Sequence, residues 1–329
     1  MLPEATLPGG ARTSRLGFGC SALLGGRTRR EARRLLDAAF DSGIRHFDVA
    51  RVYGTGDAEA VLGEFAAGRR ERLTIASKFG IDPAGGGGGA GARLGKGAVR
   101  ALTRRSRRAL AFARRHGGRT VRRGAFEPEK ARMSLAVSLA ALRTDRLDAY
   151  LLHDCGAADW GQPALQEELA GLVAEGVVGT YGPATAPAAV EAIVAAAAPA
   201  PAIVQLGVDL SADRDWPQRS PIAVTHGVYR GHLARLRERL AEPATAAAWS
   251  ADLDLDLGDG NVLGDLMLAA ALQRNPGGIV LVSAGSPERI QRNAACAAQQ
   301  VPFAPEQLEA FLALVRSALA AERAGAAAG

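Results

Sequence analysis

The 329-residue sequence predicts an α/β fold in which eight parallel strands close into a (β/α)8 barrel. Short runs rich in β-branched and apolar residues alternate strictly with amphipathic helical stretches. Parallel strands need long crossover connections, and helices of this length supply them. The chain length is typical of one such barrel, so we expect residues 1–329 to form a single domain.

Eight strand–helix units are expected in order along the chain. The strands are expected at residues 15–19, 44–49, 73–78, 147–153, 177–181, 202–206, 222–226 and 279–283. The helices are expected at residues 29–42, 57–67, 128–142, 162–175, 186–197, 231–241, 262–274 and 287–298, with a final one at 305–322. The first helix shows the reasoning, because its apolar residues recur every three or four positions and Gly43 follows its end.

An open doubly wound sheet is the competing architecture for alternating strands and helices. In that fold a GxGxxG motif usually follows an early strand and binds a dinucleotide, and no such motif occurs here. The glycine run at residues 85–89 is too uniform for a phosphate loop and is typical of a flexible linker. The barrel is therefore the preferred prediction.

A basic insertion is expected at residues 82–127, between the third strand and the third helix. Eleven arginines and Lys96 lie within residues 91–124, and no acid occurs between Asp82 and Glu127. Subtracting these twelve charges from the formal net charge of +6 leaves −6 for the rest of the chain. The insertion could be a solvated helical excursion, a lid or anion-attracting rim at the pocket, or a contact for nucleic acid or an anionic membrane surface.

The cysteines and the N-terminus indicate the cellular setting. Cys20, Cys155 and Cys296 are widely spaced and form no metal-ligand pattern, so we expect neither disulfides nor a metal site. No signal peptide is recognisable at the N-terminus, and no apolar stretch is long enough to span a membrane. We therefore expect a reduced, cytoplasmic protein.

Four ionisable residues lie at or just after three successive predicted strands. Asp48 closes the second strand, Tyr53 follows five residues later, Lys78 ends the third strand, and His153 ends the fourth. The carboxyl ends of barrel strands meet on one face, where active sites are built. Lys78 is one of only three lysines, against 37 arginines, which suggests a need for a compact ammonium group. We expect the four side chains to meet in one pocket.

These residue types fit a device for proton transfer. A free tyrosine has a pKa near about 10 and is a poor acid at neutral pH, but a nearby ammonium lowers that pKa. Asp48 would keep Lys78 charged, and His153 would orient a carbonyl oxygen. Taken singly, each residue could instead be structural. Lys78 could also form a Schiff base, as in a lyase or aldolase barrel.

Three stretches resemble the signature of the aldo-keto reductase superfamily: GIRHFDVARVYG at 43–54, SK at 77–78 and LLH at 151–153. The resemblance covers nearly the whole chain. It implies a TIM barrel that binds NADPH, with NADH as the alternative, and reduces a small aldehyde or ketone to an alcohol by hydride transfer. It also implies Tyr53 as the general acid, Lys78 and Asp48 as the groups that tune it, and His153 as the residue that orients the carbonyl.

The resemblance extends to the nicotinamide end of the cofactor, with departures. Gln205 matches the family's glutamine that contacts the nicotinamide amide. The family's Ser-Asn pair on the neighbouring strand is Ala184-Thr185 here, so only Thr185 could keep a hydrogen bond. The family places an aromatic ring under the nicotinamide after the seventh strand. His226 and Tyr229 are the candidates for that ring, and His226 is preferred.

Residues 286–293 resemble the segment that binds the adenosine phosphates. Ser286 could cap a helix whose N-terminus attracts phosphate. Arg289 matches the contact to the 2′-phosphate and Asn293 the contact to adenine. The family's lysine just upstream is Ser283 here, which keeps NADH open as the cofactor. A redox-silent relative that binds nucleotide and acts through partner contacts is the alternative function.

Overall fold

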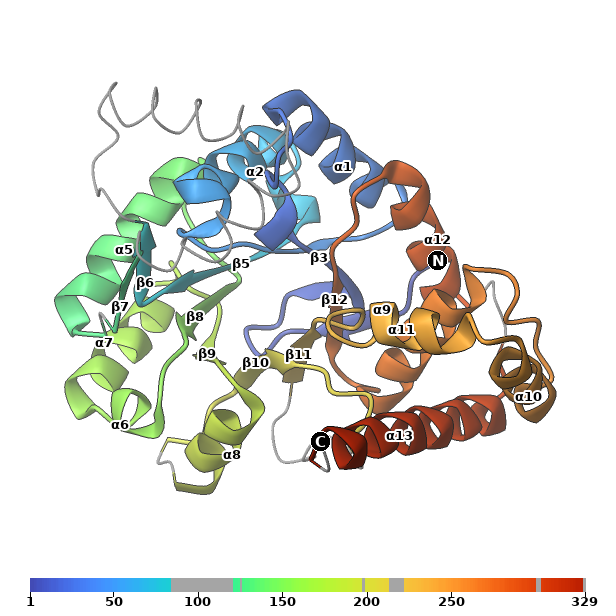
Figure 1. Ribbon diagram of the computed structural model, residues 1–329. Coiled ribbons are helices and arrows are strands. Elements are labelled where there is room, and N and C mark those ends of the chain that lie inside the picture. The colour runs from blue at the N-terminus through green and yellow to red at the C-terminus, as the bar shows by residue number, and fades with distance from the viewer. Residues whose placement is uncertain (84–120, 125, 197–198, 213–221, 300–302, 328–329) are drawn as a thin grey trace.

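Eight parallel strands form a closed barrel in this computed structural model, which describes residues 1–83, 121–124, 126–196, 199–212, 222–299 and 303–327 (Figure 1). The strands are β3 (Leu16–Gly19), β4 (His46–Asp48), β5 (Thr74–Phe79), β8 (Ala149–His153), β9 (Tyr181–Ala184), β10 (Ile203–Gly207), β11 (Ile222–His226) and β12 (Ile279–Val282). β12 pairs with β3 and closes the ring. The predicted (β/α)8 barrel is confirmed.

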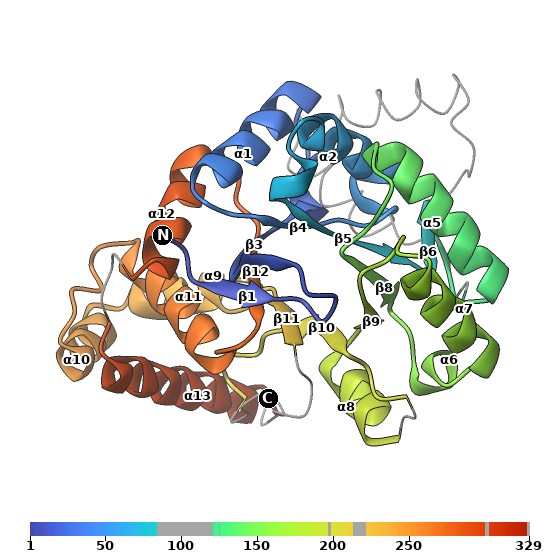
Figure 2. The same ribbon diagram turned by 180° about the vertical axis from the view of Figure 1, so that it is seen from behind.

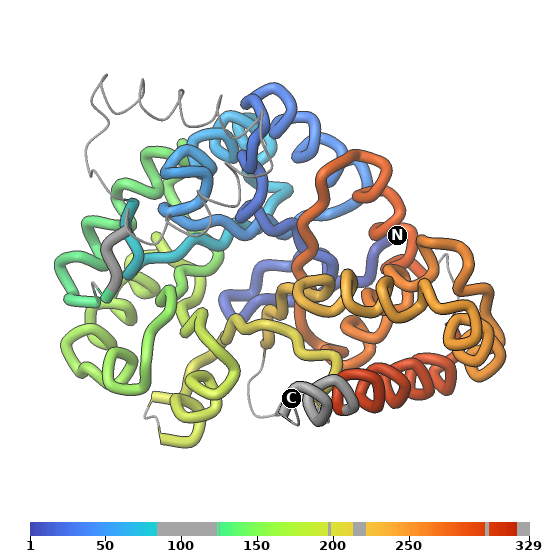
Figure 3. Tube along the Cα trace, in the orientation of Figure 1, coloured from blue at the N-terminus to red at the C-terminus, as the bar shows by residue number. Residues whose placement is uncertain are grey.

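Helices surround the barrel, and the tube in Figure 3 follows the chain around it. They are α1 (Arg29–Asp41), α2 (Ala58–Ala66), α5 (Pro128–Leu142), α7 (Pro163–Ala174), α8 (Pro187–Ala196), α9 (Leu233–Leu240), α11 (Val262–Arg274), α12 (Pro287–Ala297) and α13 (Pro305–Ala327). Local signals set their starts. Thr28 and Glu31 form a capping box at α1, and α5, α7 and α12 begin with proline in the first turn.

Several elements were not predicted. An antiparallel hairpin of β1 (Glu4–Thr6) and β2 (Arg12–Ser14) lies across the back of the barrel in Figure 2. Two additional helices, α6 (Ala157–Trp160) and α10 (Pro243–Leu253), lie in loops after β8 and α9. Among the described residues, no helix is long and apolar enough to cross a membrane, and no cluster of side chains could hold a metal ion.

The two ends of the predicted insertion are paired with each other. β6 (Ile81–Pro83) and β7 (Val121–Arg123) form an antiparallel pair. Arg51 forms an ion pair with Asp82 at 2.8 Å and donates to the Ser134 hydroxyl, which ties this pair to the loop that carries Tyr53. Residues 84–120 and 125 lie outside the described residues, so the roles suggested for the basic segment 91–124 stay predictions.

The prediction for the fifth strand was wrong by several residues. Its ordered part is β9, Tyr181–Ala184, whereas residues 177–181 were expected, and Val178 makes only an isolated bridge. Pairing with β8 sets the register and brings Ala184 level with His153. The sequence pattern did not predict a strand at Gly182-Pro183, because glycine and proline are both rare in strands. Gly182 is required there, since a Cβ atom would lie 1.8 Å from the Ile203 carbonyl oxygen.

Polar residues close the barrel interior beneath the site. His46 and Asp48 lie two residues apart on β4 and therefore point to the same side, with His46 deeper. The fully buried His46 ring contacts the Thr74 hydroxyl at 3.0 Å, and Thr74 in turn contacts Thr13 at 2.7 Å. Burial lowers the pKa of His46 to about 4, so the ring is neutral at physiological pH.

Candidate active site

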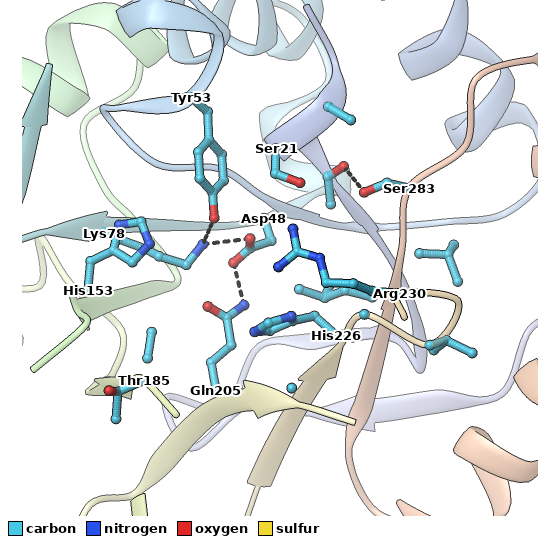
Figure 4. A pocket seen from close by; sticks show the side chains of 18 of the residues that line it. Ser21, Asp48, Tyr53, Lys78, His153, Thr185, Gln205, His226, Arg230 and Ser283 are labelled. Atoms are coloured by element: carbon cyan, nitrogen blue, oxygen red, sulfur yellow. Dashed lines mark hydrogen bonds and ion pairs between the residues drawn. The ribbon is translucent and has the colours of Figure 1, made fainter. Parts of the chain in front are cut away.

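A cavity of about 680 Å³ opens at the carboxyl ends of the barrel strands (Figure 4). Its lining includes all four residues predicted to be catalytic and three of the six predicted to bind cofactor. These seven residues are Asp48, Tyr53, Lys78, His153, Thr185, Gln205 and His226. They come from β4, β5, β8, β10 and β11 and from the loops after β4 and β9, so the barrel brings together side chains that are far apart in the sequence.

Lys78 holds the centre of the site. Only 2% of the residue is exposed. Its Nζ donates to Asp48 Oδ1 at 2.6 Å, to the Val49 carbonyl at 3.1 Å and to Tyr53 Oη at 3.4 Å, which uses all three ammonium protons. Burial alone would lower the pKa of Lys78, but Asp48 and Tyr53 together raise it above its usual value. Because a Schiff base requires a neutral amine, this environment disfavours the lyase or aldolase alternative.

Asp48 is bonded through both carboxylate oxygens. Oδ1 accepts from Lys78, and Oδ2 accepts from Gln205 Nε2 at 2.8 Å. The carboxylate is 3% exposed, and a buried charge is tolerated only when it is paired and hydrogen-bonded. Gln205 comes from β10, on the far side of the cavity from Tyr53, so the Asp48–Gln205 bond spans the site (Figure 4).

Tyr53 accepts from Lys78 Nζ through its hydroxyl and contacts His153 through its ring. The Tyr53 and His153 rings meet edge to face, with centroids 5.9 Å apart at an interplanar angle of 89°. Burial raises the pKa of the Tyr53 phenol, while the Lys78 ammonium opposes that rise. The predicted effect of Lys78 thus has the expected sign, but desolvation outweighs it, so the phenol keeps its proton at neutral pH.

Asp154 also lines the cavity, although the sequence did not single it out. It follows His153 with a left-handed φ of 58°, a conformation that aspartate tolerates better than most residues. Its backbone N–H donates to the Ala184 carbonyl at 2.9 Å, which holds the end of β8 against β9. The strand-end turn therefore places a second acidic side chain beside His153.

The two candidates for an aromatic platform, His226 and Tyr229, both line the cavity but lie in different surroundings. Tyr229 lines the cavity, but its hydroxyl donates to Asn293 Oδ1 at 3.1 Å and so faces α12. His226 lies beside Gln205 and Arg230 in Figure 4. Burial lowers the pKa of His226, with Lys78 and Arg230 acting in the same direction and Asp48 opposing them. A neutral imidazole therefore lies at the cavity wall.

Three predicted cofactor contacts, Ser286, Arg289 and Asn293, are not among the residues that line this cavity. Ser286 caps α12 by accepting from the Arg289 backbone N–H. Asn293 is 1% exposed, and its Nδ2 has no hydrogen-bond partner in the described part of the chain. An unpaired buried amide of this kind is costly, which marks the region beside α12 as a place where a polar ligand group would be stabilised.

Three further polar side chains of the cavity, Ser21, Arg230 and Ser283, were not among the predicted site residues. Figure 4 shows the Arg230 guanidinium beside His226, extended into the cavity. Ser283 donates its hydroxyl to the Gly19 carbonyl at 2.7 Å, so it links β12 to β3. Arg230 carried no distinguishing signal, because arginine is the usual basic residue throughout this sequence.

Comparison with known proteins settles the family. The aldo/keto reductase family model matches residues 15–228, which is more than half of the sequence. The chain belongs to the aldo/keto reductase family. The matched region contains the four residues that meet around Lys78, together with Thr185, Gln205 and His226. The family is one of oxidoreductases, in agreement with the resemblance found in the sequence.

Two curated relatives match over short stretches of sequence. A 6-dehydroglucose reductase from Novosphingobium aromaticivorans is 46% identical over 67 residues, and a pyridoxal 4-dehydrogenase from Microbacterium luteolum is 43% identical over 75 residues. These stretches cover 18% and 22% of this chain, and 22% of each relative's own length. The names therefore describe those two proteins, since most of each chain is not matched.

Solved structures match nearly the whole fold. An aldo-keto reductase from Klebsiella pneumoniae in complex with NADPH has a TM-score of 0.65 and 22% identity, and covers 96% of both chains. An aldo-keto reductase from Bacillus halodurans, in its holo form, has a TM-score of 0.67 and 20% identity with the same coverage. At these identities the likeness establishes the shared barrel fold.

Proposed function

We propose that this protein is an NADPH-dependent oxidoreductase that reduces a small aldehyde or ketone to an alcohol, with Tyr53 as the general acid. One observation carries the proposal: a single buried ammonium, Lys78 Nζ, contacts both the Asp48 carboxylate and the Tyr53 hydroxyl in the cavity at the carboxyl ends of the barrel strands. This arrangement favours transfer of a proton from Tyr53 to a developing oxyanion.

The residues on the other side of the cavity fit a nicotinamide nucleotide, which supplies the hydride when it is bound. The neutral His226 ring suits stacking because it adds no positive charge beside the nicotinamide. Gln205 Nε2 is committed to Asp48, so its Oε1 is the atom suited to accept from the nicotinamide amide. Thr185 lines the same wall and offers a hydroxyl. NADPH is preferred because the described arginines near α12 and the cavity suit a phosphate-rich ligand.

The chain's own residues would act at the substrate oxygen. Tyr53 and His153 hold the carbonyl oxygen between them and polarise it. As the carbonyl carbon gains the hydride, its oxygen takes the Tyr53 proton, which leaves a phenolate beside Lys78. The ammonium stabilises that phenolate, and Asp48 keeps the ammonium charged. Placement of a general acid in this way typically contributes about 10²–10⁴-fold to the rate.

A fluorescence titration with NADPH and NADH, followed by an assay against a panel of aldehydes and ketones, tests the proposal. Tyr53→Phe should reduce turnover of any active substrate by about 10²–10⁴-fold and leave NADPH affinity nearly unchanged. Tyr150→Phe is the control, because Tyr150 is a buried tyrosine whose hydroxyl donates to the Ala131 carbonyl, away from the cavity.

The outcomes separate the alternatives. Full activity in the Tyr53→Phe variant would remove Tyr53 from the mechanism. Tight NADPH binding by the unmodified protein, with no turnover of any carbonyl tested, would favour a redox-silent relative that acts through partner contacts. Failure to bind either nucleotide would sink the oxidoreductase proposal itself.

A further inference from the structure

Two arginines from distant parts of the chain flank the loop between β12 and α12. Arg289, on α12, extends toward the start of α11, where its Nη1 lies 3.6 Å from the Cβ position built on Gly264. Arg27 belongs to the loop before α1, and its Nη2 lies 2.7 Å from the Cβ position built on Gly285. The Arg27 guanidinium therefore rests directly on Gly285, the residue before the Ser286 cap of α12.

The position of Arg27 is held by the backbone. Its Nη1 donates to the Ala22 carbonyl at 2.9 Å. No ion pair in the described part of the chain involves Arg27, and the nearby Glu31 is engaged with Thr28 in the capping box. α1 packs against α12 (Figure 1), and the contact of Arg27 with Gly285 brings together the loops that precede the two helices. An oriented cation without a carboxylate partner thus faces the β12–α12 loop.

The loop itself lacks a cation. Ser283 is neutral, and its hydroxyl is committed to the Gly19 carbonyl. Glu288 adds a carboxylate in the first turn of α12, where a hydrogen bond with Ser286 and the helix backbone lower its pKa. An anionic ligand at this helix start would meet that negative charge. Positive charge sufficient to offset it must come from Arg289 and from outside the loop.

We propose that Arg27 is a specificity-determining residue of the nucleotide site. Together with Arg289, its guanidinium binds the 2′-phosphate that distinguishes NADPH from NADH. Gly285 has no side chain and therefore lets the Arg27 guanidinium approach the loop. A phosphomonoester carries about −1.5 to −2 charges at neutral pH, which two guanidinium groups match. The inference rests on the proposed cofactor role and names the residue that sets the choice of cofactor.

The placement of the arginines separates the 2′-phosphate from the diphosphate of the nucleotide. Arg230 lines the catalytic cavity next to His226, whereas Arg27 and Arg289 do not line it. In the nucleotide the diphosphate is one ribose away from the nicotinamide, and the 2′-phosphate lies farther out on the adenosine ribose. Arg230 is therefore the cation within reach of the diphosphate, and the outer pair is suited to the 2′-phosphate.

The test is a fluorescence titration of the full-length protein with NADPH and NADH, in parallel for Arg27→Gln and Arg34→Gln. Arg34 is exposed on α1, so its variant makes the same change in net charge away from the loop. Arg27→Gln should weaken NADPH binding by about 10-fold or more, the usual effect of losing a hydrogen bond between charged groups, and leave NADH affinity unchanged. Arg34→Gln should change neither.

Gly285→Ala provides a second probe that keeps the charge of Arg27. The added Cβ would lie 2.7 Å from Arg27 Nη2 and displace the guanidinium, while Gly285 has no left-handed φ that would strain an alanine. This variant should also weaken NADPH selectively. In the Arg27→Gln background the same change should add little, because the two substitutions remove one interaction.

The remaining results would overturn the inference. Equal weakening of NADPH and NADH by Arg27→Gln would place Arg27 on a part of the nucleotide that both share. Unchanged NADPH affinity, or an equal effect of Arg34→Gln, would remove the specific contact. If the unmodified protein binds both nucleotides, these results leave the proposed oxidoreductase function standing. If it binds neither, the proposed function fails and this inference fails with it.

Discussion

The two sides of the cavity are built in different ways. On the side formed by β4, β5 and β8, the charged groups are buried and bonded to one another, with Lys78 joined to Asp48 and Tyr53. On the side formed by β11 and β12, His226, Arg230 and Ser283 are partly or fully exposed. The first side is preorganised because a buried charge must be paired. The second leaves polar groups and a ring available to a ligand.

This difference between the two sides matches the distribution of the family's sequence pattern, which is kept at some positions of the cavity and lost at others. The pattern is kept at Asp48, Tyr53, Lys78 and His153, where each group depends on its neighbours. It departs at Ala184, which ends β9, and at Ser283, which follows β12, and both positions line the cavity where the nucleotide would bind. Gln205 bridges the two sides through Asp48. Substitutions on the two sides should therefore have different effects: on stability and turnover at the buried side, and on nucleotide affinity at the other.

The largest effect is expected from breaking the buried ion pair. Lys78→Met would leave Asp48 charged and unpaired at 3% exposure, which typically costs about 3–5 kcal/mol of stability. Turnover should fall by about 10²–10⁴-fold as well, because the Tyr53 phenolate loses its cation. Chemical denaturation and a carbonyl assay measure the two effects.

The double variant Lys78→Met/Asp48→Leu separates stability from chemistry. Replacing both charges with apolar side chains removes the unpaired carboxylate, so much of the lost stability should return. Turnover should not return. A Lys78→Met protein as stable as the unmodified one would show that Asp48 does not carry its charge in the folded state.

A smaller, mixed effect is expected from Gln205→Leu, because this residue joins the two sides. Asp48 Oδ2 would lose a donor, at a cost of about 1.5–3 kcal/mol of stability, and NADPH affinity should fall with it. Gln166→Leu is the matched control. Gln166 is also buried, but it donates to the Trp160 carbonyl outside the cavity. Its variant should lose stability without losing NADPH affinity, and an equal loss of affinity would refute the bridging role.

The pH dependence of the reaction should report the Tyr53 phenol. Reduction requires the protonated form, and burial raises the pKa of Tyr53. The rate of reduction should therefore stay level through neutral pH and fall only above the ordinary phenol value of about 10. Alcohol oxidation requires the phenolate, so its rate should rise with pH. Initial rates in both directions from pH 6 to about 11 test this, and a break near neutral pH would assign the proton to another group.

Much of the fold and of the buried side of the site could be predicted from the sequence. The barrel was predicted from strand–helix alternation. The grouping of Asp48, Tyr53, Lys78 and His153 was predicted from residue types at consecutive strand ends, which the topology must bring together. These signals are local, since each lies within a few residues of a recognisable strand. The fifth strand was misplaced because pairing with β8, and not local propensity, sets where β9 begins.

The exposed side could not be predicted to the same depth. Arg230 and Arg27 look like any other arginine in this chain, and their positions depend on contacts between distant segments. The packing of Arg27 on Gly285 joins residues more than 250 positions apart. The preference for His226 over Tyr229 stays a prediction, and the bond from Tyr229 to Asn293 that supports it is one that no local pattern encodes.

The smallest effect is expected at the exposed wall, from His226. If its ring stacks on the nicotinamide, His226→Ala should weaken NADPH binding by about 0.5–1.5 kcal/mol, or roughly 2–10-fold, with turnover at saturating cofactor nearly kept. His226→Phe should retain the affinity, because a neutral ring remains. Tyr229→Phe, which removes only the hydroxyl bonded to Asn293, serves as the control. Tyr229→Ala removes the other candidate ring, and a larger loss from Tyr229→Ala than from His226→Ala, measured by fluorescence titration, would move the platform to Tyr229.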